Sequence, residues 1–64
     1  MSAPRRANEC LIKASHDAEF CVENLRQALH SASAVESLLL LPMIETAVVL
    51  SRNIDALLEA RTLP

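Results

Sequence analysis

Apolar residues recur at alternating steps of three and four along two stretches of this chain, and this spacing most limits what it can fold into. The first series is Leu11, Ala14, Ala18, Cys21, Leu25, Ala28 and Ala32. The second series is Leu40, Met43, Ala47, Leu50, Ile54 and Leu57. A repeat of this kind places its residues along one side of an α-helix. The spacing therefore predicts two helices, each with an apolar side to bury.

Both series are broader than the seam of a two-stranded coiled coil. Val22 and Leu29 widen the first series by one flank, and Ile44 and Leu58 widen the second. A wider stripe is typical of a helix in a bundle. The register of the second series is shifted by one position, so we do not expect a single unbroken helix.

A turn signal lies between the two stretches. Ser33 and Glu36 have the spacing of a capping box, in which each residue satisfies a backbone N–H of the other at the start of a helix. The sequence therefore predicts one arm over about 4–30, a turn over about 30–33 and a second arm over about 34–61. Arms of equal length are typical of an antiparallel hairpin.

Pro42 conflicts with a regular second arm, because a proline inside a helix removes a hydrogen bond and clashes with the preceding turn. We expect the arm either to kink within 38–42 or to break and restart at Pro42. The run 38–41 is all leucine and covers every side of a helix, so these side chains must be enclosed on all sides or bind a partner. The predicted fold is all-α, a single domain over 1–64 built as a two-helix hairpin that dimerises into a four-helix bundle.

The prediction of a dimer follows from size. The chain has 64 residues, of which 52% are hydrophobic, and a domain this small buries only about 60% of its unfolded surface. We expect the interface between arms and copies to comprise Leu11, Ala14, Ala18, Cys21, Leu25, Ala28, Leu39, Leu41, Met43, Ala47, Leu50, Ile54 and Leu57. Phe20 lies off the first stripe and Val49 lies off the second, and both are candidate anchors for a partner. For Phe20, the only aromatic residue, we weigh this role equally against a merely exposed ring.

Composition argues against several functions. The chain has no glycine, which excludes Gly-rich phosphate-binding loops. Aromatic residues make up only 2%, so a base-stacking surface is not expected. Six basic residues against eight acidic ones give a net charge of −2, and the only basic cluster is Arg5 with Arg6. We therefore expect no nucleic-acid partner.

The residues that carry chemistry are scattered. Cys10 and Cys21 are 11 positions apart, or about 16 Å along one helix, which is beyond the roughly 7 Å that a disulfide needs. We expect both to stay reduced in a cytoplasmic protein. His16 has Glu19 at helical spacing, but no further ligand that would make a metal site. The sequence predicts no catalytic residues, no metal, no cofactor and no enzyme activity.

The most apolar stretch is 38–50, about 13 residues long and interrupted by Pro42 and Glu45. A membrane-spanning helix needs about 20 residues, so we expect no membrane association.

These observations leave three hypotheses for function. The first is a small regulatory adaptor that forms a homodimer and binds another protein. An alternative is a co-chaperone or obligate subunit whose apolar stripe is completed by a helix of a different chain. The second alternative is a nucleic-acid regulator in which Arg5, Arg6, Lys13 and Arg26 of two subunits form one basic strip.

Overall fold

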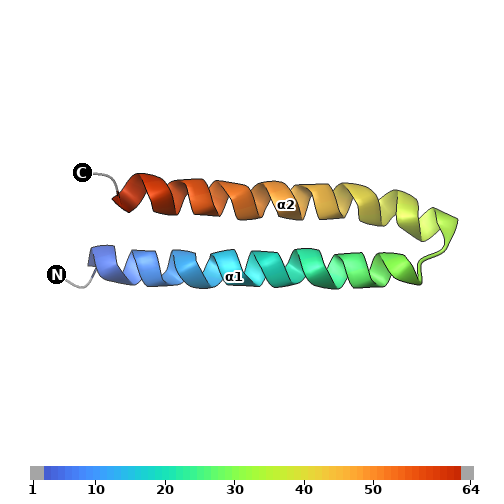
Figure 1. The fold of residues 1–64 in the computed structure, drawn as a ribbon, viewed down its shortest axis with the longest axis horizontal. Helices are drawn as coiled ribbons and strands as arrows, with labels where there is room; N and C mark the ends of the chain where they lie inside the picture. Colours follow the sequence, from blue (N-terminus) through green and yellow to red (C-terminus); the bar gives the residue numbers. More distant parts are fainter. Residues whose placement is uncertain (1–2, 63–64) are drawn as a thin grey trace.

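The computed structural model describes residues 3–62, and the side chains of residues 6–62. It consists of α1 (Ala3–His30) and α2 (Ala34–Thr62). The helices run antiparallel and side by side along their whole length (Figure 1). Over the described residues the fold is therefore the all-helical hairpin that the three–four spacing predicts. The predicted arms, 4–30 and 34–61, lie within the observed helices.

Residues 31–33 connect the helices, and local hydrogen bonds define this turn. The backbone N–H of Ser33 donates to Glu36 Oε1 (2.8 Å), and the N–H of Glu36 donates to Ser33 Oγ (3.2 Å). The predicted capping box is confirmed. It satisfies two donors that the first turn of a helix otherwise leaves unpaired, and so it fixes where α2 begins.

Pro42 lies inside α2, which continues through it without interruption. The hydroxyl of Thr46 donates to the carbonyl oxygen of Pro42 (2.9 Å). The expected break and restart at Pro42 is therefore wrong. A bend within the continuous helix stays a prediction.

The contact between the helices follows the three–four repeat, but it is rotated by one position from the predicted seam. On α1 the less exposed positions include Leu11, Ser15, Ala18, Val22, Leu25 and Leu29, and Ala32 of the turn continues the series. On α2 they include Ser37, Leu40, Ile44, Ala47, Ser51, Ile54 and Leu58. Val22, Leu29, Ile44 and Leu58, which the sequence predicts as flanks, thus belong to the seam itself. The polar residues Ser15, Ser37 and Ser51 occupy seam positions, which is why the apolar pattern alone misplaces it.

Two hydrogen bonds between the helices set their register. The hydroxyl of Ser15 donates to Asp55 Oδ1 (2.6 Å), and Nε of Arg61 donates to Asn8 Oδ1 (2.6 Å). In this register, residues at the same level of the hairpin have numbers that add up to about 70.

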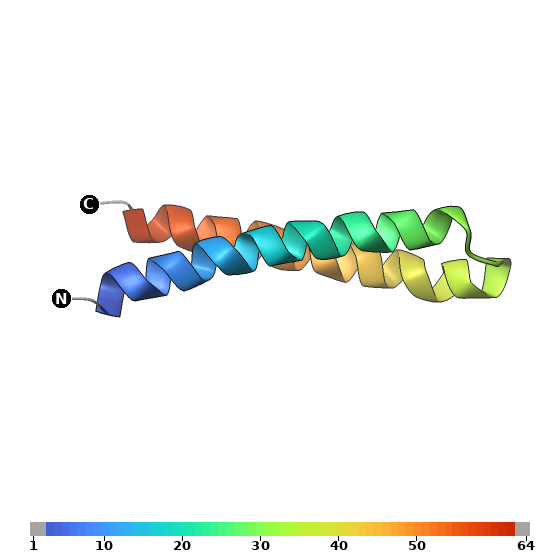
Figure 2. The ribbon, with the colours of Figure 1, turned by 90° about the horizontal axis from the view of Figure 1, so that it is seen from below.

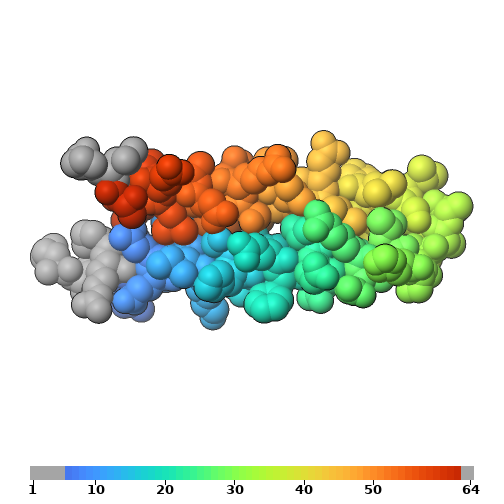
Figure 3. Space-filling view, in the orientation of Figure 1, coloured from blue at the N-terminus to red at the C-terminus, as the bar shows by residue number. Residues whose placement is uncertain are grey.

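The molecule is one layer of helices and measures 50 × 17 × 12 Å. Figure 2 shows the helices crossing at a shallow angle, and Figure 3 shows side chains of the two helices meeting along the described part of the hairpin. Among the described side chains, only Ser15, Ala18 and Val22 are buried, all of them near the middle of α1. Most domains bury a core between two packed layers. Since this hairpin is a single layer, it has little core of its own.

Candidate interaction surface

Two long sides of the hairpin, above and below the seam, differ in chemistry. On one side, two adjoining hollows form a continuous depression between the helices, which we call the apolar groove. Its α1 wall comprises Cys21, Leu25 and Ala28, and Ser31 and Ala32 of the turn continue this wall. Its α2 wall comprises Glu36, Leu39, Leu40, Pro42, Met43, Thr46, Ala47 and Leu50. Of these residues only Glu36 carries a charge, at the turn end.

The walls of the apolar groove continue toward the termini by the seven-residue repeat. Ala14 stands one repeat before Cys21, and Leu57 stands one repeat after Leu50. Met43, Leu50 and Leu57 each keep about half of their surface exposed. Large apolar side chains left open to water along one side of a helix are typical of interaction surfaces.

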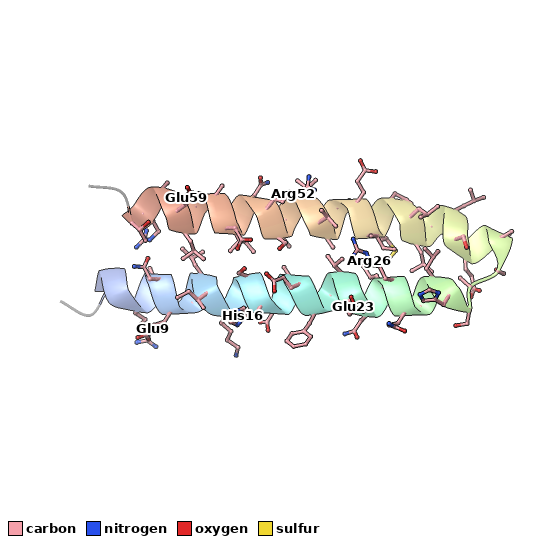
Figure 4. The ribbon with its side chains drawn as sticks, in the orientation of Figure 1. Glu9, His16, Glu23, Arg26, Arg52 and Glu59 are labelled. Atoms are coloured by element: carbon pink, nitrogen blue, oxygen red, sulfur yellow. The ribbon has the colours of Figure 1, made fainter. Side chains whose placement is uncertain are left out.

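The opposite side of the hairpin is charged. A second depression there is lined by Glu19, Val22, Glu23, Arg26, Val48, Ser51 and Arg52. Figure 4 shows Arg26 between the two helices, with Glu23 on α1 and Arg52 on α2. This charged groove is suited to water, so the two long sides of the hairpin make it amphipathic as a whole.

The turn end of α2 is apolar on several sides at once. Val35, Leu38, Leu39 and Leu41 are all more than half exposed, with Leu38 at 73%. Within the hairpin the leucine run 38–41 is thus covered only at Leu40, which lies at the seam.

The predicted interface residues divide into three groups in the structure. One group lies at the seam within the hairpin: Leu11, Ala18, Leu25, Ala47 and Ile54. A second group lies on the side of the apolar groove: Ala14, Cys21, Ala28, Leu39, Met43, Leu50 and Leu57. Leu41 lies on neither, because the seven-residue repeat places it with Val48 of the charged groove.

The possible anchors Phe20 and Val49 both point away from the seam. Phe20 is 68% exposed and lies beside His16, Glu19 and Glu23. Val49 is 48% exposed on the outer side of α2. The structure does not bring them together, since they lie on the outer sides of different helices.

The two hydrogen bonds between the helices are features that the sequence reasoning missed. Asn8 and Ser15 precede Val22 and Leu29 at steps of seven, so all four occupy the same position of the repeat. This spacing could have identified Asn8 and Ser15 as polar members of the seam.

The basic residues of the nucleic-acid hypothesis form no strip along one chain. Arg6 and Lys13 are exposed on α1, whereas Arg26 lies in the charged groove beside Glu19 and Glu23. The side chain of Arg5 lies outside the described residues.

Titratable groups give little sign of a reactive site. Both cysteines are free and exposed. Among the described residues, no three His, Cys, Asp or Glu side chains are placed to hold a metal ion. The pKa of Glu36 lies below its ordinary value, because the carboxylate accepts a hydrogen bond from the Ser33 backbone N–H and interacts with the Ser33 hydroxyl.

By length and composition, α2 is long and apolar enough to cross a bilayer. The apolar stretch 38–50 is too short to span a bilayer, whereas the helix extends beyond it on both sides. Glu36 and Glu45 lie in its apolar part, and a charge at the bilayer centre costs at least about 2.5 kcal/mol.

No protein-family model, no curated protein and no solved structure was found to match this chain.

Proposed function

We propose that the protein is a small, non-enzymatic interaction protein that acts as a homodimer. Two hairpins join through their apolar grooves into a four-helix bundle, and the bundle serves in the cytoplasm as a regulatory adaptor for another protein. The observation that carries this proposal is the apolar groove, an almost uncharged side of an otherwise charged hairpin.

The surface area supports a missing partner. The chain exposes 5101 Å², whereas a folded globular protein of 7.0 kDa exposes about 4,000 Å². The excess of about 1,100 Å² is somewhat more than the roughly 800 Å² that each partner buries in a standard interface.

The shape supports a second copy. The apolar groove lies on a side of the hairpin that measures 50 Å by 17 Å, or about 850 Å², again the size of one half of a standard interface. A second hairpin has the same length and offers the same apolar surface in return. Such self-complementary pairing is the commonest form of oligomer.

The proposal includes a bend in α2 at Pro42. Because proline has no N–H, the carbonyl of Leu38 lacks its helical hydrogen bond, and the proline ring pushes against that turn. A bend here would turn the exposed leucines of the turn end relative to the rest of the groove. These leucines are the proposed binding site for the adaptor's target.

The experiment compares two glutamate variants by sedimentation equilibrium. Leu50 lines the apolar groove and Val49 does not, although both are about half exposed in the hairpin. We expect the parent chain to sediment at twice its 7.0 kDa mass. Leu50→Glu removes one leucine of each copy from the dimer interface, and burial of each side chain contributes about 1.5–3 kcal/mol. The variant is therefore expected to weaken association about 100-fold or more.

Val49→Glu is the matched control and is expected to leave the mass unchanged. A parent chain that stays folded as a monomer would contradict the proposal, and so would equal association of both variants.

A membrane-bound protein is the second candidate, because α2 passes the length and composition criterion. Flotation with phosphatidylcholine vesicles distinguishes the membrane-bound protein from the homodimeric adaptor. We expect the dimer to stay in the aqueous fraction, whereas flotation together with protection of α2 from protease would favour a spanning helix.

A further inference from the structure

The walls of the apolar groove differ in size. The α1 wall presents small side chains at Ala14, Cys21 and Ala28, whereas the α2 wall presents large ones at Met43, Leu50 and Leu57. The register of the hairpin brings these residues to common levels. Cys21 and Leu50 line one hollow, Ala28 and Met43 line the next, and Ala14 and Leu57 follow by the same repeat.

Polarity also changes along the length of the hairpin. The turn end carries the exposed leucines of the run 38–41. At the other end the seam itself is polar, where Asn8 and Arg61 are hydrogen bonded, and Glu9 and Glu59 are exposed (Figure 4).

Two hairpins that meet groove to groove around a two-fold axis have two possible arrangements. If the axis runs along the helices, α1 of each copy packs on α2 of the other and both turns lie at the same end. If the axis runs across the helices, α1 packs on α1, α2 packs on α2, and the turns lie at opposite ends.

We propose that the second copy docks with α1 on the partner's α2 and with both turns at the same end. This inference rests on the proposed homodimer and specifies its geometry. Each large side chain of the α2 wall then faces a small one of the partner's α1 wall, which keeps all helices evenly spaced and fills the core. The crossed arrangement would place alanine against alanine on one side and leucine against leucine on the other.

The polarity of the two ends supports the same choice. With the turns together, the leucine run of one copy lies beside that of the other, and the polar ends also meet. With the turns apart, Leu39 and Leu40 of each copy would face the Asn8–Arg61 end of the partner, which would bring a charged guanidinium against apolar side chains.

Spin labels at two outward-facing positions of α2 test this geometry. Val35 and Ala56 are both exposed and are separated by three seven-residue repeats, so they share one side of the helix. Each is changed to cysteine and labelled in a Cys10→Ala, Cys21→Ala background, and the distance between the two labels of a dimer is measured by pulsed electron paramagnetic resonance.

In the proposed arrangement the labels lie at equal levels on diagonal helices, whose axes are about 14 Å apart when neighbouring helices are about 10 Å apart. The outward reach of each labelled side chain adds to this separation, so both variants give about the same distance, about 30 Å. In the crossed arrangement the two-fold axis passes at the level of Leu50, the middle one of the three large residues of the α2 wall. The Val35→Cys labels then lie about 45 Å apart along the helix direction, because each is 15 residues from Leu50 at about 1.5 Å per residue. The Ala56→Cys labels would then approach to about 20 Å. Unequal distances of this kind would overturn the proposed orientation.

Sedimentation of the labelled variants keeps this result separate from the dimer itself. A dimer with unequal distances contradicts only the orientation, whereas a parent chain without any dimer contradicts the proposed function as well. If the cysteine-free background dissociates, the unmodified chain is used instead, in dimers mixed from isotope-labelled and unlabelled copies. Nuclear Overhauser contacts from the Ala28 methyl to the partner's Met43 are then expected, and contacts from Ala28 to the partner's Ala14 would overturn the orientation.

Discussion

Small side chains at the seam control how closely α1 and α2 approach. Ala18 is 6% exposed, and the register places it at the level of Ser51, another small residue. A larger residue at 18 has no free space to fill. Ala18→Leu is therefore expected to lower the free energy of unfolding by about 1–3 kcal/mol, as measured by thermal denaturation followed by circular dichroism.

Ala56→Leu is the control for this variant, because Ala56 is exposed on the outer side of α2. We expect it to change the melting temperature little. Equal melting of both variants would show that Ala18 does not face α2.

The capping box makes the start of α2 sensitive to pH. The Ser33 N–H and hydroxyl hold the pKa of Glu36 below its ordinary 4.5. A carboxylate with a lowered pKa in the folded state stabilises the fold fully above the unfolded-state pKa, and loses this contribution as pH falls through the folded-state pKa. The stability difference between the parent and Glu36→Gln is therefore expected to be constant above pH 4.5 and to shrink below it.

Glu45→Gln, at an exposed position on the same helix, is the control for the effect of removing one negative charge. Ser33→Ala removes the cap from the other side and is expected to cost about 0.5–2 kcal/mol at neutral pH. If the difference between the parent and Glu36→Gln were independent of pH down to pH 2, the capping box would not be formed in solution.

At the scale of the helix, α2 continues through Pro42 without interruption. Pro42→Ala restores the hydrogen bond to the Leu38 carbonyl and removes the clash, so it is expected to stabilise the protein by up to about 3 kcal/mol. The change is measured by chemical denaturation. Val49→Ala, one repeat later on the same side of the helix, controls for helix propensity and is expected to have a smaller effect. Equal stability of Pro42→Ala and the parent would mean that α2 accommodates the proline without a bend.

The helices and the turn could be predicted because their determinants are local. The three–four spacing identifies both helices, and Ser33 with Glu36 identifies the start of the second. The seam could not be placed from the apolar pattern, because several repeats carry adjacent apolar residues, such as Cys21 with Val22 and Met43 with Ile44. Which member of a pair faces the other helix depends on contacts between distant residues, here the Ser15–Asp55 and Asn8–Arg61 hydrogen bonds.

The apolar groove could not be predicted for the same reason. Once Val22 and Ile44 face each other's helix, Cys21 and Met43 are left at one edge of the seam. The sequence indicates that more apolar surface exists than one hairpin can bury. Only the fold shows that part of the surplus, including Met43 and Leu50, gathers along one side.

For the whole molecule, the two thiols distinguish a free groove from a covered one. Cys21 lines the apolar groove and Cys10 does not, yet both are exposed in the single hairpin. In the proposed dimer, Cys21 is expected to react with Ellman's reagent more slowly than Cys10. Dilution below the dissociation constant is expected to bring the two rates together, and Cys21→Ala is expected to destabilise the protein more than Cys10→Ala.

The Cys10→Ala and Cys21→Ala single variants assign the two rates. Equal reactivity of both thiols at a concentration where sedimentation finds a dimer would place the interface away from the groove.

The first residue of α1 and the last residue of α2 lie at the same end of a molecule 50 Å long, and the turn lies at the other end (Figure 1). A domain or tag fused to either end of the chain would therefore lie at this end of the molecule and would leave the leucine-rich turn accessible. The same closeness permits circular permutation. A short linker could join Thr62 to Ala3, and new ends could be opened at 31–33, so that α2 precedes α1 in the chain. Such a permutant keeps the seam and the groove while it loses the three-residue connection, and so it would separate the contribution of helix packing from that of the turn.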